Sequence, residues 1–300
     1  MILQINLKDN DFDFIIDFRP RRKILQELII SRFIYNSKTI LTVHSFLIDY
    51  YMPKSVWLTK LIYGRNYATV AIVDNVKKLI ESKYDLKNVI TIPNPINLDE
   101  INEKCNEKIN IDFDYIIAVG QYESPVKQFD KLIRSYADSA LPERKIHLII
   151  LGRGDKIPLE KIARDNNVLA YVHFLGFKNN PYKYLKNAKF SVLSSLNEGM
   201  PNVLLESLAC STPVIAFDCL TGPKEIIENR ENGILVENQD FKKLTEAINM
   251  LVENEQLYNY YKKNALGSIQ EFSLDTIGKQ WLDLMKIESF SEESDKELWK

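Results

Sequence analysis

Two glutamates, a glycine and a proline stand close together in the stretch SSLNEGMPNVLLES at residues 194–207. Glu198 precedes Glu206 with seven residues between them, and Gly199 and Pro201 follow the first glutamate. Pro201 suits the first turn of a helix, where its missing N–H would have no partner anyway, and Gly199 lets the backbone approach a ligand. The positive end of a helix attracts an anion, and carboxylates accept hydrogen bonds from hydroxyl groups. The stretch therefore indicates a site for a phosphorylated polyol.

A second loop, GQYESPVK at 120–127, combines a glycine with a lysine. Only one of the ten glycines, Gly64, lies in the first 119 residues, so a turn that cradles phosphate is expected in the second half. Lys127 can supply the cation for such a phosphate; a surface lysine at a helix start is the alternative. Gly152 and Gly154 predict either a tight turn or a nucleotide contact.

The second half alternates short apolar strands with helical stretches. Runs such as YIIAVG and HLIILG are continuously apolar, which is typical of a parallel sheet buried on both faces. The expected strands are 115–120, 146–152, 171–175, 190–195, 213–218 and 233–237, and the expected helices are 126–138, 159–166, 181–188, 202–210, 223–228 and 241–252. This pattern predicts a doubly wound α/β domain with strand order 3-2-1-4-5-6. The first and fourth strands are then neighbours, so the loops that carry Lys127 and Glu198 should meet.

The first half shows the same alternation, with strands expected at 14–18, 40–44, 69–73 and 89–93 and helices at 21–35, 56–62 and 75–83. His44 ends one of these strands and is either a site residue or a histidine satisfied in the core. We therefore expect two Rossmann-like three-layer domains, at 1–105 and 106–265. Helices are expected from 255 onward, of which one at 266–287 is expected to cross back to the first domain, and an acidic tail follows at 288–300.

The composition is that of a globular protein. The 300 residues are 45% hydrophobic and 27% charged, which excludes a disordered chain. No run reaches the ~18 apolar residues of a membrane span, and the acidic stretch MILQINLKDNDFDF is neither a secretory nor a transit signal. Three scattered cysteines and three histidines offer neither a disulfide framework nor metal-ligand spacing. We expect a cytoplasmic protein with no metal and no nucleic-acid partner.

Positive charge is concentrated near the start of the chain. Residues 1–95 hold 14 Lys and Arg against 9 Asp and Glu, whereas the remaining residues hold 25 against 32. The basic cluster RPRRK at 19–23 precedes an apolar stretch at 24–34, a combination that can lie on anionic lipid. This interpretation predicts peripheral contact with the inner face of the plasma membrane. The alternative is a core helix with a solvated basic start.

Together these motifs resemble family 4 of the retaining nucleotide-sugar glycosyltransferases, which have the two-domain GT-B architecture. The main match is the Glu-x7-Glu frame SSLNEGMPNVLLESLACSTPVIAFD at 194–218. Further matches are IIAVG at 116–120, LIILGRGD at 148–155, VHFLGF at 172–177, TGPKEII at 221–227, NGILV at 232–236, LTVHS at 41–45 and ITIPNPIN at 90–97. The resemblance covers roughly residues 12–285, and the set in this order is highly specific.

The resemblance implies a role for each matching residue. Glu206 would hold the ribose hydroxyls of a nucleotide, Glu198 would hold hydroxyls of the donor sugar, and Lys127 would neutralise the leaving diphosphate. His44 would face the donor sugar across a cleft, so the implied catalytic residues are Glu198, His44 and Lys127. The other implied donor-binding residues lie at strand ends and at a helix start: Gly120, Gln121, Gly152, Gly199, Met200, Pro201 and Asn202.

The family retains anomeric configuration, usually without a metal and with no other cofactor. The resemblance therefore implies a nucleotide-diphosphate sugar as the donor substrate. It implies a glycan or a lipid-linked glycan as the acceptor, in bacterial cell-envelope polysaccharide assembly. Positive side chains and helix ends would then stabilise the leaving group.

Two departures from the family pattern bear on activity. Gln121 stands where the family usually has arginine, and a neutral hydrogen bond is weaker than a charged one. Relatives also carry further strands before the region that matches 14–18, so we expect a shortened N-terminal domain. Either the acceptor site is built differently, or a protein partner or second copy completes it, or the chain is a fragment. A non-catalytic subunit that binds nucleotide sugars is the alternative function.

Overall fold

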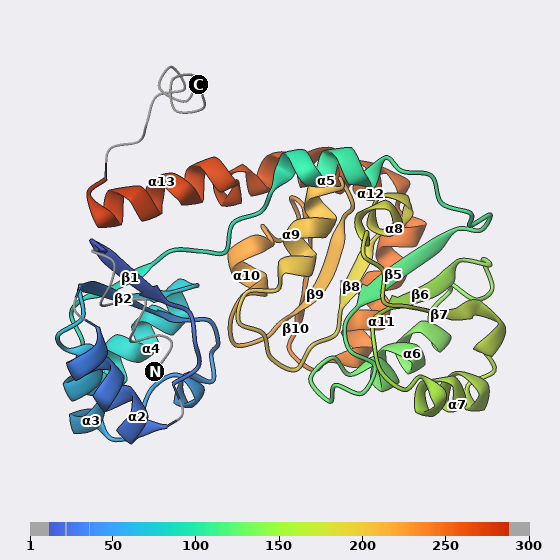
Figure 1. Cartoon of the computed structure of the whole chain (residues 1–300). Helices are drawn as coiled ribbons and strands as arrows, with labels where there is room; N and C mark the ends of the chain where they lie inside the picture. The colour runs from blue at the N-terminus through green and yellow to red at the C-terminus, as the bar shows by residue number, and fades with distance from the viewer. Residues whose placement is uncertain (1–11, 22, 36, 288–300) are drawn as a thin grey trace, which may run out of the picture. The chain divides into compact units, whose positions relative to one another are not determined.

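The computed structural model describes residues 12–21, 23–35 and 37–287. They form two compact units: one is Ile96–Ser273, and the other joins the part up to Pro95 with the helix that begins at Leu274. Each unit contains its own parallel sheet (Figure 1), so the predicted α/β fold with two sheets is confirmed. Domain limits at 105 and 265 stay predictions from the sequence, and the predicted tail at 288–300 lies outside the described residues.

The larger unit is built on a six-stranded parallel sheet. Its strands are β5 (Tyr115–Val119), β6 (His147–Leu151), β7 (Val172–Gly176), β8 (Ser191–Leu193), β9 (Val214–Asp218) and β10 (Gly233–Glu237). The order β10-β9-β8-β5-β6-β7 is the predicted doubly wound order counted from the other edge. Since β5 and β8 are hydrogen-bonded neighbours, with Ile117 opposite Ser191, the point where the strand order reverses lies between them.

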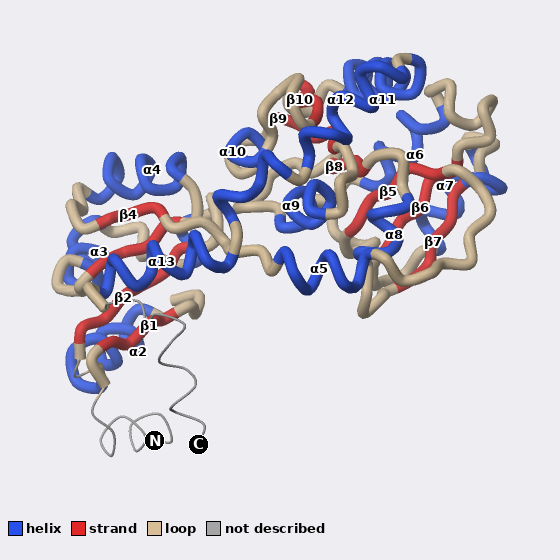
Figure 2. The backbone as a smooth tube through the Cα atoms, turned by 90° about the horizontal axis from the view of Figure 1, so that it is seen from above, coloured by secondary structure: helices blue, strands red, loops and turns tan. Residues whose placement is uncertain are grey.

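Two layers of helices cover this sheet (Figures 1 and 2). In one layer, α6 (Phe129–Ala137) contacts α7 (Ile157–Asp165) and α11 (Phe241–Glu253), and α12 (Glu255–Ala265) follows α11. The other layer contains α5 (Leu98–Cys105), α8 (Tyr182–Asn187), α9 (Asn202–Ala209) and α10 (Pro223–Ile226). The sequence analysis missed only α5 among these helices. In α5 only Ile101 and Cys105 are buried, which is too sparse an apolar pattern to reveal a helix in a polar stretch.

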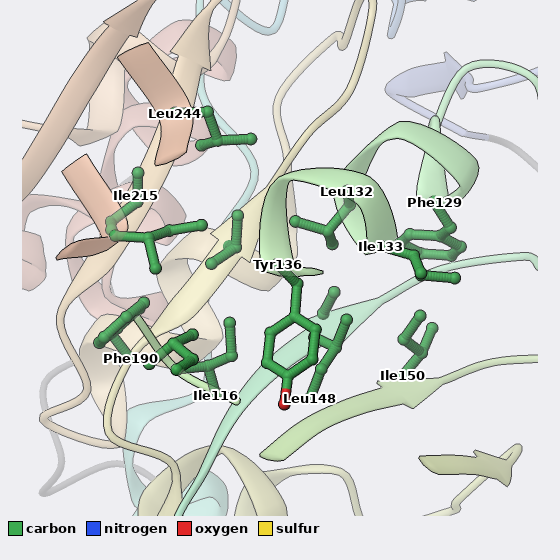
Figure 3. Close-up of a cluster of buried hydrophobic side chains, with 14 of the residues drawn as sticks. Ile116, Phe129, Leu132, Ile133, Tyr136, Leu148, Ile150, Phe190, Ile215 and Leu244 are labelled. Carbon is green, nitrogen blue, oxygen red and sulfur yellow. The ribbon is translucent and has the colours of Figure 1, made fainter. Parts of the chain in front are cut away.

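The core of the larger unit lies between the sheet and α6 (Figure 3). Ile116 and Leu148 from β5 and β6 belong to the same buried cluster as Leu132 and Tyr136 of α6. The Tyr136 hydroxyl donates to the carbonyl of Ile146 at 2.9 Å, so its polar end is satisfied. Burial of each such side chain contributes about 1.5–3 kcal/mol, and the packed core holds the strand ends in place.

The smaller unit has a four-stranded parallel sheet in the order β1-β2-β3-β4. Its strands are β1 (Phe14–Asp17), β2 (Lys38–Val43), β3 (Ala68–Ala71) and β4 (Val89–Thr91), and its helices are α2 (Ile24–Ile29), the π-helix η1 (Ile30–Ile34), α3 (Val56–Tyr63), α4 (Asp74–Tyr84) and α13 (Leu274–Met285). On α13, Ile277 and Trp281 pack against Ile40 and Val70 of the sheet. Among the described residues, no helix combines the length and apolar character that crossing a membrane requires.

The predicted basic cluster is turned partly inward. Arg21 is 3% exposed, and its guanidinium donates to the hydroxyl of Tyr63 at 2.6 Å and to two backbone carbonyls. Arg19 forms an ion pair with Asp17 at 2.8 Å. Burial opposes the ionisation of Asp17, but hydrogen bonds and charge from the two arginines outweigh it and lower its pKa. Arg21 is therefore not available to a membrane surface, whereas Arg19 pairs with Asp17 but stays exposed; peripheral membrane contact stays a prediction, and residue 22 lies outside the described residues.

The ends of β5 and β6 approach one another too closely for a side chain at Gly152. A Cβ atom there would lie 1.7 Å from the carbonyl oxygen of Gly120. We predict that Gly152→Ala lowers the free energy of unfolding by about 3 kcal/mol, because the backbone must shift to relieve the overlap. Gly278 lies within α13, where a Cβ atom would meet nothing within 4 Å, so Gly278→Ala should stabilise by ~0.5–1 kcal/mol. Urea unfolding of both variants checks the pair; equal effects would contradict the steric explanation.

Candidate functional site

The loop after β5 and the loop after β8 lie side by side at the point where the strand order reverses. The backbone N–H of Leu196 donates to the carbonyl of Val126 at 2.8 Å. The hydroxyl of Ser194 donates to the carbonyl of Lys127 at 2.7 Å. These two bonds come from the segments that the sequence placed together, so the predicted meeting of the two loops is confirmed.

Lys127 and Glu198 form an ion pair across this junction. The Nζ of Lys127 lies 2.7 Å from Oε1 of Glu198, and the two side chains are only 22% and 14% exposed. Gly120 makes this approach possible, since a Cβ atom at that position would lie 2.9 Å from Cγ of Lys127. The aliphatic part of the lysine therefore passes over the glycine and brings its ammonium group to the carboxylate. A cation and an acceptor of hydrogen bonds are thus held together at the carboxyl ends of β5 and β8.

The loop after β9 supports the segment that follows Glu198. The hydroxyl of Thr221 donates to the carbonyl of Glu198 at 2.5 Å. Gly222 has φ +96° and lies so close that a Cβ atom there would be 2.6 Å from the carbonyl oxygen of Gly199 and 2.7 Å from Cδ of Pro201. The N–H of Gly222 is in turn satisfied by Oε2 of Glu225 at 2.9 Å. Neither Thr221 nor Gly222 was assigned a role from the sequence, although both lie in a stretch that matched the family.

The helix α9 carries the second glutamate of the motif. The helix begins at Asn202, with Pro201 as its N-cap residue and Met200 buried just before it. Glu206 is half-buried, and its carboxylate forms no hydrogen bond or ion pair with a residue that the structure describes. Burial raises the pKa of Glu206. A desolvated carboxylate without a protein partner is suited to accept hydrogen bonds from a ligand.

Ser195 is a further polar group at this junction. It directly follows Ser194 after the end of β8 and is 1% exposed, yet its hydroxyl has no hydrogen-bond partner among the described residues. Buried hydroxyl groups normally have a partner, and leaving one without it costs about 1–3 kcal/mol. The sequence analysis missed Ser195, because only the tertiary structure shows which hydroxyl in the run is buried and unsatisfied.

A cavity of about 410 Å³ opens beside the ends of β5 and β6. It is lined by Gln121, Glu123, Ser124, Pro125, Arg153 and Gly154. Arg153 is the one cation in this set, and its guanidinium carbon lies 3.9 Å above the ring of Phe177. Gln121, which replaces the arginine usual in the family, therefore shares a cavity with an arginine from the next loop. The sequence analysis passed over Arg153 because the two positions lie more than thirty residues apart.

The hydroxyl of Tyr122 ties three strand ends together in this region. It accepts from the N–H of Gly176 at 2.9 Å and donates to the carbonyl of Ile150 at 3.2 Å. The N–H of Tyr122 also donates to the carbonyl of Arg153 at 2.8 Å. These bonds fix the cavity walls, and the close approach of Gly152 to Gly120 accounts for the glycine at 152 as a packing requirement.

His44 belongs to the smaller unit and follows β2. Its Nε2 lies 2.9 Å from Oγ1 of Thr42. Because the Thr42 hydroxyl gives its single proton to the carbonyl of Asp17 at 3.1 Å, it must accept a proton from Nε2. Burial, and then the charge of Arg21, lower the pKa of His44, against a hydrogen bond with Asn94 that raises it. The imidazole is therefore held neutral with its proton on Nε2.

The other two histidines and an Asp-x-Asp pair lie away from the junction. His147 and His173 share a hydrogen bond of 2.8 Å near the amino ends of β6 and β7, at the far edge of the sheet from the loops described above. An Asp-x-Asp pair is present at Asp112 and Asp114, before β5, where Asp114 pairs with Lys189 at 2.9 Å. Within the described ranges, no three or more His, Cys, Asp or Glu side chains are grouped so that they could hold a metal ion.

The fold and the arrangement of loops define a protein of the GT-B class. A glycosyltransferase from Rickettsia africae has a similar structure, with a TM-score of 0.81 and 17% identity over 95% of this chain and 79% of the other. Anabaena HepE in complex with UDP has a TM-score of 0.79 at 18% identity, over 95% and 80% of the two chains. Residues 99–267 match the family described as "Glycosyl transferases group 1". The chain belongs to this family.

Relatives with curated names agree with this assignment. An uncharacterized glycosyltransferase from Methanocaldococcus jannaschii is 31% identical over 292 residues, which cover 82% of this chain and 71% of the relative. An N-acetylgalactosaminyltransferase from Campylobacter jejuni, named for a diphospho-undecaprenol-linked acceptor, is 34% identical over 63% of this chain. The match spans about half of that relative's length, 51%.

The burial of Glu206 leads to a prediction about how the melting temperature depends on pH. Because the pKa of Glu206 is higher in the folded state than in the unfolded state, its ionisation lowers the free energy of unfolding. This destabilisation is fully present only at a pH above the folded-state pKa. We predict that Glu206→Gln raises the melting temperature at pH 8, and that the gain vanishes below about pH 4, where the carboxyl group is protonated in both states. Glu246→Gln, at an exposed position on α11, is the matched control. A melting temperature for E206Q that never exceeds that of the parent chain would contradict the role of burial.

Proposed function

We propose that the chain is a glycosyltransferase that moves a sugar from a nucleotide-diphosphate sugar to a hydroxyl group of a glycan or lipid-linked glycan. Anomeric configuration is retained, and neither a metal nor another cofactor takes part, as the family resemblance implies. The observation that carries the proposal is the ion pair of Lys127 and Glu198 at the reversal of strand order. Ligands of doubly wound sheets bind at this point, outside the carboxyl ends of the strands.

The two groups of the ion pair suit two parts of a nucleotide-diphosphate sugar, the hydroxyl groups of the sugar and the diphosphate. Oε1 of Glu198 is held by Lys127, which leaves the other carboxylate oxygen for hydroxyl groups of the donor sugar. Lys127 lies beside the backbone turn at Gly120 and can neutralise the negative charge that develops on the departing diphosphate. The ammonium group is already in place before the reaction, so little reorganisation accompanies bond cleavage.

Glu206 and Ser195 complete the donor site in this proposal. The carboxylate of Glu206 accepts hydrogen bonds from the ribose hydroxyls, since it is desolvated and has no described protein partner. The buried hydroxyl of Ser195 gains the partner that it lacks. For His44 the role toward the donor sugar is proposed from the family resemblance alone; within the smaller unit its Nε2 lies 2.9 Å from Oγ1 of Thr42.

The names of several relatives suggest the acceptor. Those from Campylobacter jejuni are named for diphospho-undecaprenol-linked sugars, and one from Staphylococcus aureus for poly(ribitol-phosphate). We therefore place the reaction in the assembly of envelope polysaccharide, on the cytoplasmic side of the plasma membrane. The matches cover only part of several relatives, so the acceptor is proposed by class alone.

Purified chain mixed with a panel of UDP-sugars and GDP-sugars tests the proposal. Thermal shift should show stabilisation by one nucleotide, because ligand binding raises apparent stability by mass action. The matching donor should then be hydrolysed slowly, and NMR of a transferred sugar should show a retained anomer. Binding without any hydrolysis or transfer would favour the non-catalytic subunit instead. Stabilisation by no nucleotide would exclude both functions.

Removing either partner of the central ion pair should impair turnover. We predict that Lys127→Ala lowers kcat/KM by about 10²–10³, because it removes charge stabilisation of the leaving group. Glu198→Gln should lower kcat more than it changes KM. Since the two groups act as a unit, the double variant should be little worse than the worse single variant. Lys263→Ala, at an exposed position on α12, is the control. Additive losses in steady-state kinetics would contradict a coupled pair.

The cavity shared by Gln121 and Arg153 leads to a second kinetic prediction. If Arg153 supplies the charge that Gln121 lacks, Arg153→Ala should weaken donor binding by about 1 kcal/mol, roughly fivefold. Adding Gln121→Arg to the Arg153→Ala variant should restore the lost donor affinity. Arg134→Ala, at an exposed position on α6, should leave the donor Kd unchanged. Calorimetric titration with the donor nucleotide measures the three variants against the parent chain; a normal Kd for R153A would refute the compensation.

A further inference from the structure

One face of the smaller unit exposes an apolar stripe. α2 continues directly into the π-helix η1, and Leu25, Ile29 and Phe33 recur at intervals of four residues along them. Leu25 is 79% and Phe33 81% exposed. The neighbouring helix α3, which contacts α2, adds Trp57, which is 69% exposed. Large apolar side chains this exposed on helices that contact one another mark an interaction surface rather than ordinary scatter.

Three cations without counter-ions lie beside the stripe. A cavity of about 420 Å³ lies between the end of η1, the end of α3 and the start of β2, and its lining includes Arg32, Lys38 and Arg65. No acidic side chain belongs to the lining, and none of the three forms an ion pair with a described carboxylate. Arg32 donates to the carbonyl of Leu61 at 2.6 Å, which fixes it between η1 and α3.

These cations differ from the basic cluster at 19–23. There the guanidinium groups of Arg19 and Arg21 are engaged by Asp17 and by buried oxygen atoms, and that of Arg21 is itself buried. Glu27, the one acidic residue of α2 and η1, is likewise buried and contacts Arg19 at 3.3 Å. Exposed apolar side chains on α2, η1 and α3 and cations that form no ion pair with a described carboxylate therefore occur in the same part of the smaller unit.

We propose that the face formed by α2, η1 and α3 docks on an anionic phospholipid bilayer. Leu25, Ile29, Phe33 and Trp57 enter the interface between head groups and acyl chains, where tryptophan is favoured. Arg32, Lys38 and Arg65 hold lipid phosphates in and around the neighbouring cavity. The charge of the face complements an anionic lipid surface, which is why a bilayer is chosen over an apolar protein partner. The docking surface stands independently of the proposed transfer reaction.

Sedimentation with vesicles tests the proposal. The chain should pellet with equimolar phosphatidylglycerol and phosphatidylcholine, weakly with phosphatidylcholine alone, and less as salt screens the charges. The double variant Leu25→Ser/Phe33→Ser should reduce partitioning by about tenfold or more. Ile157→Ser alters an equally exposed apolar residue on α7 of the other unit and should have no effect. Equal pelleting of the double variant and the parent chain would overturn the proposal.

Charge reversal and fluorescence provide the second arm. Arg65→Glu should weaken partitioning by about tenfold, whereas Lys263→Glu, with the same change in net charge, should not. Trp57 emission should shift to the blue on vesicle binding, and Trp57→Phe should abolish that shift. If the chain is a dimer in solution and L25S/F33S dissociates it, the surface binds a second copy of the chain and the bilayer proposal is overturned. Unchanged melting temperatures establish that each variant is folded. If the chain binds vesicles but no nucleotide donor, the docking proposal holds while the proposed function fails.

Discussion

The site depends on one ion pair, between Lys127 and Glu198, that joins two loops separated by about seventy residues. Parallel strands with their order reversed between β5 and β8 bring those loops to the same edge of the sheet. Partly buried ion pairs gain little net stability, because desolvation offsets the attraction between the charges. The pair is therefore better explained by what it positions: a cation and a carboxylate that together face the place where a ligand of this fold binds.

Close backbone packing makes that arrangement possible. Gly120 admits the stem of Lys127, Gly152 admits the carbonyl of Gly120, and Gly222 admits the turn at Gly199. Each contact would be blocked by a single Cβ atom, so the loops after β5, β6, β8 and β9 pack closely at this end of the sheet. Against this background the unsatisfied hydroxyl of Ser195 and the unpaired carboxylate of Glu206 are unusual. A well-packed site that leaves such groups without partners is prepared for a polar ligand.

The smaller unit handles charge in a different way. Arg19 and Arg21 are engaged by Asp17 and by carbonyl groups at the ends of β1 and β2. Burial, and then the charge of Arg21, lower the pKa of His44. Near the outer helices of the smaller unit, Arg32, Lys38 and Arg65 form no ion pair with a described carboxylate, and exposed apolar side chains lie on those helices. The positive balance of the first 95 residues thus divides between an internal network and an outward face, and the two parts serve separate purposes.

Much of the fold was predictable from the sequence, because continuous apolar runs and glycine or proline breaks act locally. These patterns predicted all ten strands, the strand order of the larger sheet, and hence the meeting of Lys127 with Glu198. They could not reveal α5, whose apolar pattern is sparse, or the burial of Arg21. Arg153, Thr221 and the unsatisfied Ser195 also became visible only in the tertiary structure. Burial and partnership depend on neighbours that are distant in the chain, and only the packed fold determines which neighbours those are.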